Sequence, residues 1–95
     1  MASAIAQHIL VSTLEKANEV RAKLDKGAKF DEMAARYSSC SSGDRGGDLG
    51  EFGPGVMVRQ LDDLIFKDKV ALKTVHGPIQ TEFGYHLLYI TKRTR

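Results

Sequence analysis

The first and last patterned segments of the chain alternate with the period of two that is typical of β-strands. Residues 5–11 and 85–91 both place mainly apolar side chains on each of their two faces. One face carries Ala6, His8 and Leu10 in the first segment and His86, Leu88 and Ile90 in the second. A strand that is apolar on both faces is covered on both sides, so we predict that the first strand is central in its sheet. Each strand contains one histidine.

Between these strands the apolar spacing changes to that of helices. The pattern predicts a first helix from residue 14, with Ser12 or Thr13 as its cap and Gly27 at its end. A second, short helix is predicted over residues 30–37, and its apolar side chains are assigned to the core. The apolar positions are Leu14, Ala17, Val20 and Leu24 in the first helix and Phe30, Met33, Ala34 and Tyr37 in the second.

The remaining segments complete a single domain of 95 residues. Residues 38–48 have no apolar period and are rich in Ser and Gly, which predicts a loop whose backbone can approach a ligand. Short strands are predicted at residues 49–52 and 74–80, the latter an edge or bulged strand because of Gly77-Pro78. A third short helix is predicted at residues 62–67, with Asp62 and Asp63 near its positive N-terminal end. The order of elements indicates an α+β fold with a mainly antiparallel sheet.

Charge and composition narrow the partners and the setting. The net charge of +2 comes from 14 basic and 12 acidic residues spread along the chain, and the one basic cluster, residues 92–95, is predicted to be a solvated end. We therefore expect no nucleic-acid partner. No apolar run approaches the roughly 20 residues that span a bilayer, so no membrane segment is expected. A lone cysteine and a start without the pattern of a secretory signal favour a cytoplasmic protein, which we expect to be a monomer.

Three side chains stand out as candidates for chemistry. His8 and His86 lie in apolar strands, where an imidazole group without a polar partner loses about 1–3 kcal/mol. The simplest partner for each is the other, and such a histidine is more often a hydrogen-bonded core residue than a ligand or a base. Cys40 is flanked by serines ahead of a glycine-rich stretch, which argues against deep burial and favours a position lining a pocket.

The same three residues leave two other kinds of site open. A cysteine nucleophile with a histidine base would use the same residue types. A zinc site would too, but the close spacings CxxC and HxxxH are absent, and neither a metal nor another cofactor is expected.

Four short blocks stand in order along nearly the whole chain. They are Gln7–Val11, Tyr37–Ser42 leading into Gly46–Phe52, Gly55–Met57, and Thr81–His86. Together they resemble the parvulin family of peptidyl-prolyl cis/trans isomerases. The resemblance implies a parvulin-like (FKBP-like) four-stranded antiparallel sheet surrounded by three to four helices. It also implies that the two histidines lie side by side on the central strands, with the cysteine above them.

Matching positions in this family imply roles for individual residues. The catalytic positions are similar to His8, Cys40, Thr81 and His86. The apolar pocket for the substrate proline is matched by Leu49, Phe52, Met57, Leu61 and Phe83.

Two departures from the family pattern bear on the substrate. Many parvulins have Pro-Phe where this chain has Gln60-Leu61, so the pocket wall stays apolar but loses an aromatic face, which can weaken catalysis. The segment 12–16 is short and singly basic, unlike the basic loop of the phosphate-directed members, so we expect no preference for phosphorylated substrates.

The implied reaction is rotation about an X–Pro amide, against a barrier of about 18–20 kcal/mol. No bond has to break, because a pocket that binds the twisted amide better than the planar one lowers the barrier. We therefore expect a non-covalent role for Cys40, with proline-containing peptides and unfolded proteins as substrates and assistance to protein folding as the function. One rival is a binding module with the same fold and poor turnover. Another is a cysteine hydrolase, for which no third orienting residue is evident.

Overall fold

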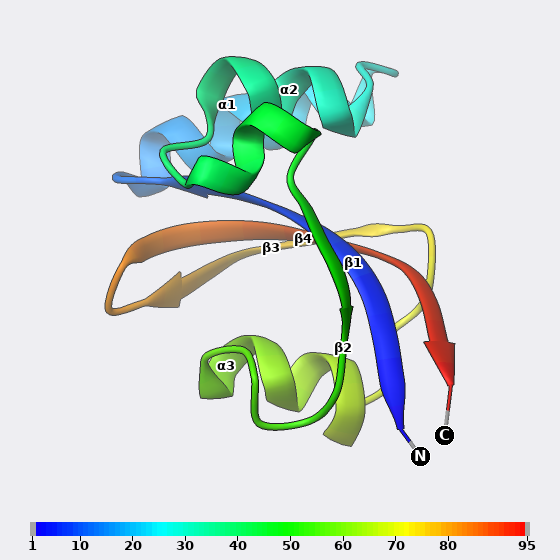
Figure 1. Cartoon of the computed structure of the whole chain (residues 1–95). Helices are drawn as coiled ribbons and strands as arrows, with labels where there is room; N and C mark the ends of the chain where they lie inside the picture. The colour runs from blue at the N-terminus through cyan, green and yellow to red at the C-terminus, as the bar shows by residue number, and fades with distance from the viewer. Residues whose placement is uncertain (1, 95) are drawn as a thin grey trace.

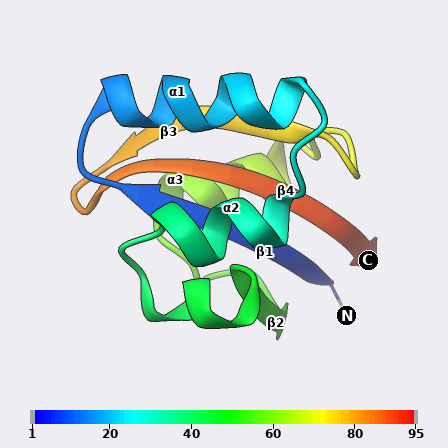
Figure 2. The ribbon, with the colours of Figure 1, turned by 90° about the horizontal axis from the view of Figure 1, so that it is seen from above.

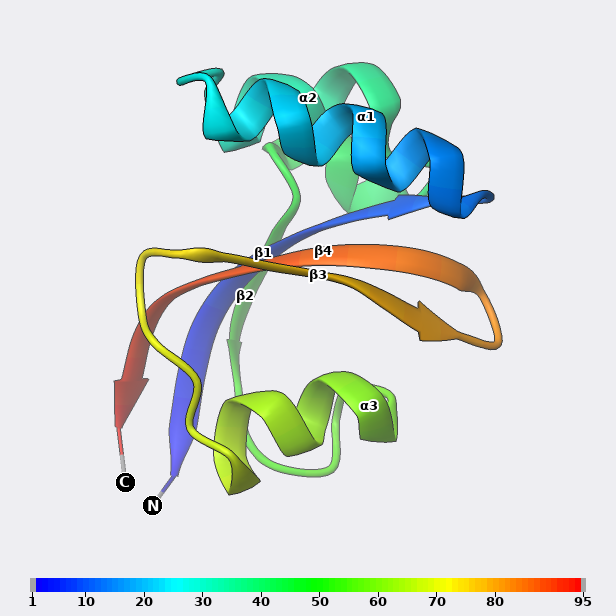
Figure 3. The ribbon, with the colours of Figure 1, turned by 180° about the vertical axis from the view of Figure 1, so that it is seen from behind.

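The sheet of this protein has the strand order β2-β1-β4-β3, and all neighbouring pairs are antiparallel. The computed structural model describes residues 2–94. Figure 1 shows α1 and α2 above the sheet and α3 below it, and the views from above and behind show the same layers (Figures 2 and 3). The elements are β1 (Ser3–Val11), α1 (Leu14–Asp25), α2 (Phe30–Tyr37), a 3₁₀ helix (Ser41–Arg45), β2 (Asp48–Phe52), α3 (Arg59–Asp62), a π-helical turn (Asp63–Lys67), β3 (Val75–Thr81) and β4 (Gly84–Thr94). The predicted α+β class and four-stranded antiparallel sheet are confirmed.

The two central strands, β1 and β4, bring the two histidines onto one face. His8 pairs with Leu88 across the strands, and Leu10 pairs with His86. Directly paired residues point to the same face, and residues two apart in one strand also share a face. The two imidazoles are therefore diagonal neighbours, although 78 positions separate them in the sequence.

Each face of the sheet buries its own apolar cluster, as the alternating pattern predicts. The α1/α2 face buries Ile9, Val11, Ala17, Val20, Phe30, Met33, Ala34 and Leu87. The α3 face buries Ala4, Ala6, Phe52, Leu61, Ile65, Leu88 and Ile90. The central strands contribute alternate residues to the two clusters, so the position of a histidine in the strand decides which face it enters.

The first two helices follow the predicted boundaries closely. The Thr13 hydroxyl caps α1 by accepting the backbone N–H of Lys16 at 3.1 Å. Gly27, with a φ of +104°, turns the chain after the helix. Leu14, in the first turn, is 49% exposed and lies outside the core.

Two predicted segments differ in the structure. The loop predicted at residues 38–48 contains the 3₁₀ helix Ser41–Arg45. α3 begins at Arg59 rather than at residue 62 and continues into the π-helical turn, so Asp62 and Asp63 lie in mid-helix and not at its start. Helical turns this short contain too few residues to produce a periodic signal.

The C-terminal strand also changes the interpretation of the basic end. The guanidinium group of Arg93 donates hydrogen bonds to the carbonyl oxygens of Ile65, Lys69 and Val70, at 3.3, 3.2 and 2.9 Å. This side chain therefore supplies hydrogen-bond donors to carbonyl groups within and just beyond the π-helical turn, and it is not simply solvated. Arg95, which belongs to the same predicted basic end, lies outside the described residues. Within residues 2–94, no helix combines the length and the apolar character needed to cross a bilayer.

The edge strand β3 is interrupted as predicted. Its pairing with β4 shifts between His76 and Ile79, on either side of Gly77-Pro78. Proline cannot donate to a ladder and is tolerated at a sheet edge or a bulge. Gly77 has a φ of +117°, and a Cβ there would lie 2.5 Å from the carbonyl oxygen of His86. Glycine is therefore required at the point where β3 passes β4 beside the histidine.

Candidate active site

A cavity of about 350 Å³ lies on the α3 face of the sheet and has the two histidines in its lining. We call it the histidine pocket. It is lined by His8, Leu10, Cys40, Leu49, Val56, Met57, Val58, Leu61, Phe83 and His86. None of these residues is acidic or permanently basic, and the volume falls in the range of about 300–1,000 Å³ that is usual for small-ligand pockets. The pocket is thus an apolar space with a few neutral polar atoms.

The floor of the pocket is a pair of stacked imidazoles. Nδ1 of His8 and Nδ1 of His86 are 3.2 Å apart, and the ring centroids are 5.4 Å apart with an interplanar angle of 22°. The two side chains are only 6% and 3% exposed. Each histidine therefore supplies the polar partner that the other needs in an apolar layer, as the sequence predicts.

Two hydrogen bonds link the ring of His86 to Thr81 and Thr81 to the backbone. The hydroxyl oxygen of Thr81 accepts the backbone N–H of Phe83 at 3.2 Å and lies 2.8 Å from Nε2 of His86. A hydroxyl has one proton to donate and two lone pairs that accept, so it can donate to Nε2 or accept a proton from it. The other nitrogen of the His86 ring, Nδ1, faces Nδ1 of His8, where one ring donates and the other accepts. Thr81 is buried behind the imidazoles and acts on the pocket through them.

Burial keeps both imidazoles neutral at neutral pH. Loss of hydration and, to a smaller extent, repulsion from His86 together lower the pKa of His8 from 6.5 to about 4. Burial also lowers the pKa of His86. A neutral pair adds hydrogen-bonding groups to the pocket without bringing in a charge that an apolar ligand would have to desolvate.

The sole cysteine of the sequence is held beside the imidazoles by the two serines that precede it. The Ser38 hydroxyl accepts the backbone N–H groups of Leu10 and Cys40 at 3.1 and 3.3 Å. The backbone N–H of Ser39 donates to the Leu10 carbonyl at 2.7 Å. These contacts tie the end of α2 to the end of β1, and so they place Cys40 over the strand that carries His8.

The other end of this loop is tied to His8 itself. The backbone N–H of His8 donates to the Gly47 carbonyl at 2.9 Å. Gly47 has a φ of +82°, and a Cβ there would lie 2.4 Å from the carbonyl oxygen of His8. The glycine-rich loop predicted to approach a ligand thus brings its backbone close to β1 and forms one wall of the pocket.

The structure gathers most of the predicted site residues in the pocket lining but leaves two outside it, Thr81, which contacts His86, and Phe52. Phe52 is buried, pairs with Ala4 near the start of β1, and packs edge-to-face against Phe66, with ring centroids 6.1 Å apart. It lies beyond the pocket because β2 carries it four positions along β1 from His8. Phe52 therefore supports the core beneath α3, and its predicted contact with the substrate ring is not supported by the pocket lining.

Three lining residues were not predicted. Leu10 shares a strand face with His8, and that alternation was sufficient to find it. Val56 and Val58 flank Met57 in the segment between β2 and α3, where no periodic pattern indicates direction. Val56 and Phe83 are 63% and 62% exposed, so both reach the mouth of the pocket rather than its floor.

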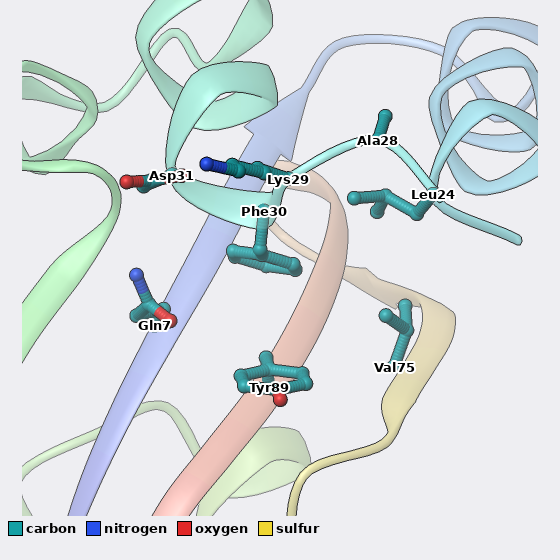
Figure 4. Close-up of a pocket in the computed structure, with 8 residues that line it drawn as sticks. All are labelled: Gln7, Leu24, Ala28, Lys29, Phe30, Asp31, Val75 and Tyr89. Carbon is teal, nitrogen blue, oxygen red and sulfur yellow. The ribbon is translucent and has the colours of Figure 1, made fainter. Parts of the chain in front are cut away.

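A second cavity lies on the α1/α2 face of the sheet (Figure 4). Its volume is about 430 Å³ and we call it the Tyr89 cavity. It is lined by Gln7, Leu24, Ala28, Lys29, Phe30, Asp31, Val75 and Tyr89. The rings of Phe30 and Tyr89 stack with centroids 5.5 Å apart, and Figure 4 shows them face to face below the start of α2. Charged and amide groups border it, and it contains neither a histidine nor a thiol.

No metal ligand set is evident in the part of the chain that the structure describes, residues 2–94. Within it, no three side chains of His, Cys, Asp or Glu are gathered as metal ligands would be. The pocket therefore offers an apolar grip, two neutral imidazoles, a thiol and backbone groups. These suit binding and reshaping a small apolar segment of a peptide.

Comparison with known proteins agrees with this geometry. The family model of the PPIC-type PPIase (rotamase) domain matches residues 8–92. The foldase protein PrsA of Geobacillus kaustophilus is 44% identical over 91 residues, which cover 95% of this chain and 32% of that protein. PrsA of Bacillus subtilis is 43% identical over 89 residues, 92% of this chain and 30% of that protein. The chain thus spans about a third of the length of these curated relatives.

Solved structures show the same similarity in three dimensions. The crystal structure of the peptidylprolyl isomerase PrsA from Bacillus anthracis superposes with a TM-score of 0.92 at 35% identity, covering 99% of this chain and 43% of that one. The solution structure of NmPin, the parvulin of Nitrosopumilus maritimus, gives a TM-score of 0.83 at 35% identity. That match covers 97% of this chain and 98% of the archaeal protein.

Proposed function

The chain belongs to the family of PPIC-type peptidyl-prolyl cis/trans isomerase domains, the parvulins, and we propose that the histidine pocket is where it binds and rotates X–Pro bonds. Its peptidyl-prolyl isomerase activity assists protein folding, and its substrates are proline-containing segments of unfolded proteins. The observation that carries the assignment of the site is the neutral imidazole pair at the floor of an apolar pocket. A proline ring is apolar, and the carbonyl beside it needs a hydrogen-bonding environment that suits its twisted form.

Rotation requires that the amide lose its resonance, and the pocket can favour the twisted state in two ways. The apolar walls formed by Leu49, Met57, Leu61 and Phe83 hold the ring in place while the carbonyl outside it turns. Water is excluded from the floor, so the dipole of the turning carbonyl interacts with Cys40 and the imidazoles in a medium of low polarity. Each preference of about 1.36 kcal/mol for the twisted over the planar amide accelerates rotation tenfold.

Cys40 supplies an environment in this proposal and not a bond. No covalent step is needed for a conformational reaction. The neighbouring imidazoles are paired with each other and have a lowered pKa, so they are poorly suited to take a proton from a thiol. His8, His86 and Thr81 are proposed to hold the shape and the polarity of the floor.

The test replaces the thiol and follows rotation directly. Exchange NMR on a short Ala-Pro peptide measures the cis/trans interconversion rate with and without the protein. We expect the wild-type chain to accelerate exchange, and Cys40→Ser and Cys40→Asp to keep measurable activity with an unchanged fold. Complete loss of activity in a well-folded Cys40→Ser variant would revive the nucleophile. The hydrolase is tested separately, because only a hydrolase would make a labelled peptide lose mass by cleavage.

A binding module with the same fold is the second candidate. The observation that favours it is Leu61, fully buried in the pocket wall at a position where many parvulins present a phenylalanine ring. A pure binder would broaden the peptide signals without speeding exchange. A panel of X–Pro peptides completes the test. A preference for phosphoserine before proline would contradict the proposal, because the turn between β1 and α1 is Ser12-Thr13 without a basic residue, and Lys16 in the first turn of α1 ion-pairs with Glu19.

A cytoplasmic location and a monomeric state remain predictions of the sequence. A single cysteine in a half-buried position beside the pocket suits a reducing compartment. Cell fractionation and sedimentation of the purified chain check these two points.

A further inference from the structure

The segment that joins β2 to α3, residues 53–58 (GPGVMV), forms one side of the histidine pocket. It contributes three lining side chains, those of Val56, Met57 and Val58. We call it the rim segment. In Figure 3 it leaves β2, loops below the helix and returns into α3. Its path decides how closely these three side chains approach a bound ring.

The rim segment has little backbone support of its own. Pro54 followed by Gly55 is typical of a tight turn whose third residue has a positive φ, and Gly55 has a φ of +87°. Val58 accepts the first hydrogen bonds of α3 through its carbonyl. Among the described residues 2–94, one hydrogen bond involves residues 54–57. In it the Gly55 N–H donates to Oδ1 of Asp62 at 2.9 Å.

Asp62 is well placed to make this contact. It stands at the end of the α-helical part of α3, next to the fully buried Leu61, which forms the adjoining pocket wall. Its carboxylate reaches back seven residues to the turn. A carboxylate accepting a backbone N–H gives a charge-assisted hydrogen bond, which is stronger and shorter than a neutral one.

The next residue has a different role and provides a matched comparison. The Asp63 carboxylate lies 3.7 Å from Nε of Arg59 in an i,i+4 ion pair on the same helix, and Arg59 is 88% exposed. Such surface pairs contribute little to stability. Asp62 and Asp63 are therefore adjacent, equal in charge and similar in exposure, but in the structure only Asp62 contacts the rim segment.

We propose that Asp62 is a positioning residue of the isomerase site, which holds the rim segment over the histidine pocket through the Gly55 N–H and so sets the affinity for the substrate. The proposal rests on the function assigned to the histidine pocket. Asp62 does not contact the reacting bond, so its loss weakens the grip on the proline and its neighbours and leaves the floor of imidazoles unchanged. The expected signature is a raised KM with a nearly constant kcat.

The test compares Asp62→Ala, Asp62→Asn and Asp63→Ala in the full chain. The isomerisation of an Ala-Pro peptide is followed by exchange NMR over a range of peptide concentrations. We expect Asp62→Ala to raise KM about threefold to tenfold, the effect of losing one exposed charge-assisted hydrogen bond. Asparagine keeps an acceptor oxygen at the same place, so Asp62→Asn should stay within about twofold of wild type. Asp63→Ala should stay within the same limit.

A second measurement examines the contact without relying on activity. Hydrogen exchange of the Gly55 amide should accelerate in Asp62→Ala and not in Asp63→Ala, because the N–H loses its acceptor only in the first. Equal KM values for the two alanine variants, or a fall in kcat as large as the rise in KM, would overturn the proposal. If the wild-type chain does not speed exchange, the proposed function fails by itself. Peptide dissociation constants from chemical-shift titration then still test Asp62, and the same ranking of variants is required.

Discussion

Two of the cavities lie on opposite faces of the sheet, and these two differ in chemistry more than in size. The histidine pocket measures about 350 Å³ and the Tyr89 cavity about 430 Å³. Both have apolar walls supplied by strands and helices. The histidine pocket has two buried neutral imidazoles and a thiol, whereas the Tyr89 cavity is bordered by Lys29, Asp31 and Gln7 (Figure 4).

The difference shows why the kind of polar group identifies the site better than the volume does. Charged side chains at a rim keep their hydration and cost little, so their presence needs no functional explanation. A buried imidazole pair does cost free energy, since both rings lose hydration and must remain neutral. The α3 face of this sheet is distinguished by what surrounds that pair: a threonine, a loop that requires glycine, and the register of the strands.

The largest expected effect is on the pH dependence of stability, and it belongs to the histidine side. In the unfolded chain His8 titrates with a pKa of 6.5, and in the folded chain with a pKa of about 4. Between these values the unfolded state binds a proton that the folded state does not, so the free energy of unfolding falls as the pH falls. The contribution is complete above about pH 6.5 and lost by about pH 4, and it amounts to about 3 kcal/mol at roughly 1.36 kcal/mol per pKa unit. His86 acts in the same direction.

Urea unfolding at a series of pH values and NMR titration of the imidazole C–H protons measure this effect. Lys29→Ala, at the rim of the Tyr89 cavity, serves as the control and should leave the slope unchanged. A His8 ring that titrates near 6.5 in the folded protein, or a stability that does not change between pH 7 and pH 4.5, would contradict the buried neutral pair.

The second expected effect comes from filling each cavity in turn. Leu49→Trp places a large ring in the histidine pocket, and Ala28→Trp does the same at the Tyr89 cavity. We expect Leu49→Trp to lower kcat/KM for an Ala-Pro peptide by about 100-fold, which corresponds to about 2.7 kcal/mol of transition-state binding. Ala28→Trp should stay within about twofold. Exchange NMR gives the rates, and an amide spectrum confirms that both variants are folded; a similar loss in both would mean that the cavities are not functionally distinct.

The sequence was sufficient to place the histidines on their faces but not to measure their contact. Alternation assigns His8 and His86 to apolar strands, and the parvulin resemblance implies that they are neighbours. The distance of 3.2 Å depends on a register in which Leu10 pairs with His86, and strand periodicity excludes a slip of one residue but not a slip of two. Leu10 could have been found by the same alternation, because it lies two positions from His8.

Other features could not be predicted from the sequence, for a different reason. The hydrogen bond from Gly55 to Asp62 and those from Arg93 to carbonyls beyond α3 depend on where irregular backbone runs. Neither leaves a periodic pattern. Phe52 shows the converse, since its family position implies contact with the substrate ring, whereas its place near the start of β1 directs its own ring toward Phe66 and outside the pocket lining. Local pattern predicts faces and helices, and side chains that act across loops require the folded chain.

The smallest expected effect concerns Thr81, the outermost member of the histidine network. Thr81→Val keeps the shape of the side chain but removes the hydroxyl that lies 2.8 Å from Nε2 of His86. We expect a loss of about 1–2 kcal/mol in the free energy of unfolding and a threefold to tenfold lower kcat, because buried Nε2 loses its hydrogen-bond partner and the His86 ring is held at one nitrogen fewer. The ¹⁵N shifts of His86 report this change directly.

Thr91→Val is the control, since the Thr91 hydroxyl donates to the Ile5 carbonyl at 3.0 Å and does not touch the histidine pocket. We expect Thr91→Val to cost similar stability and to leave the His86 shifts and kcat unchanged. If it changes them as much as Thr81→Val does, the network does not set the polarity of the pocket floor.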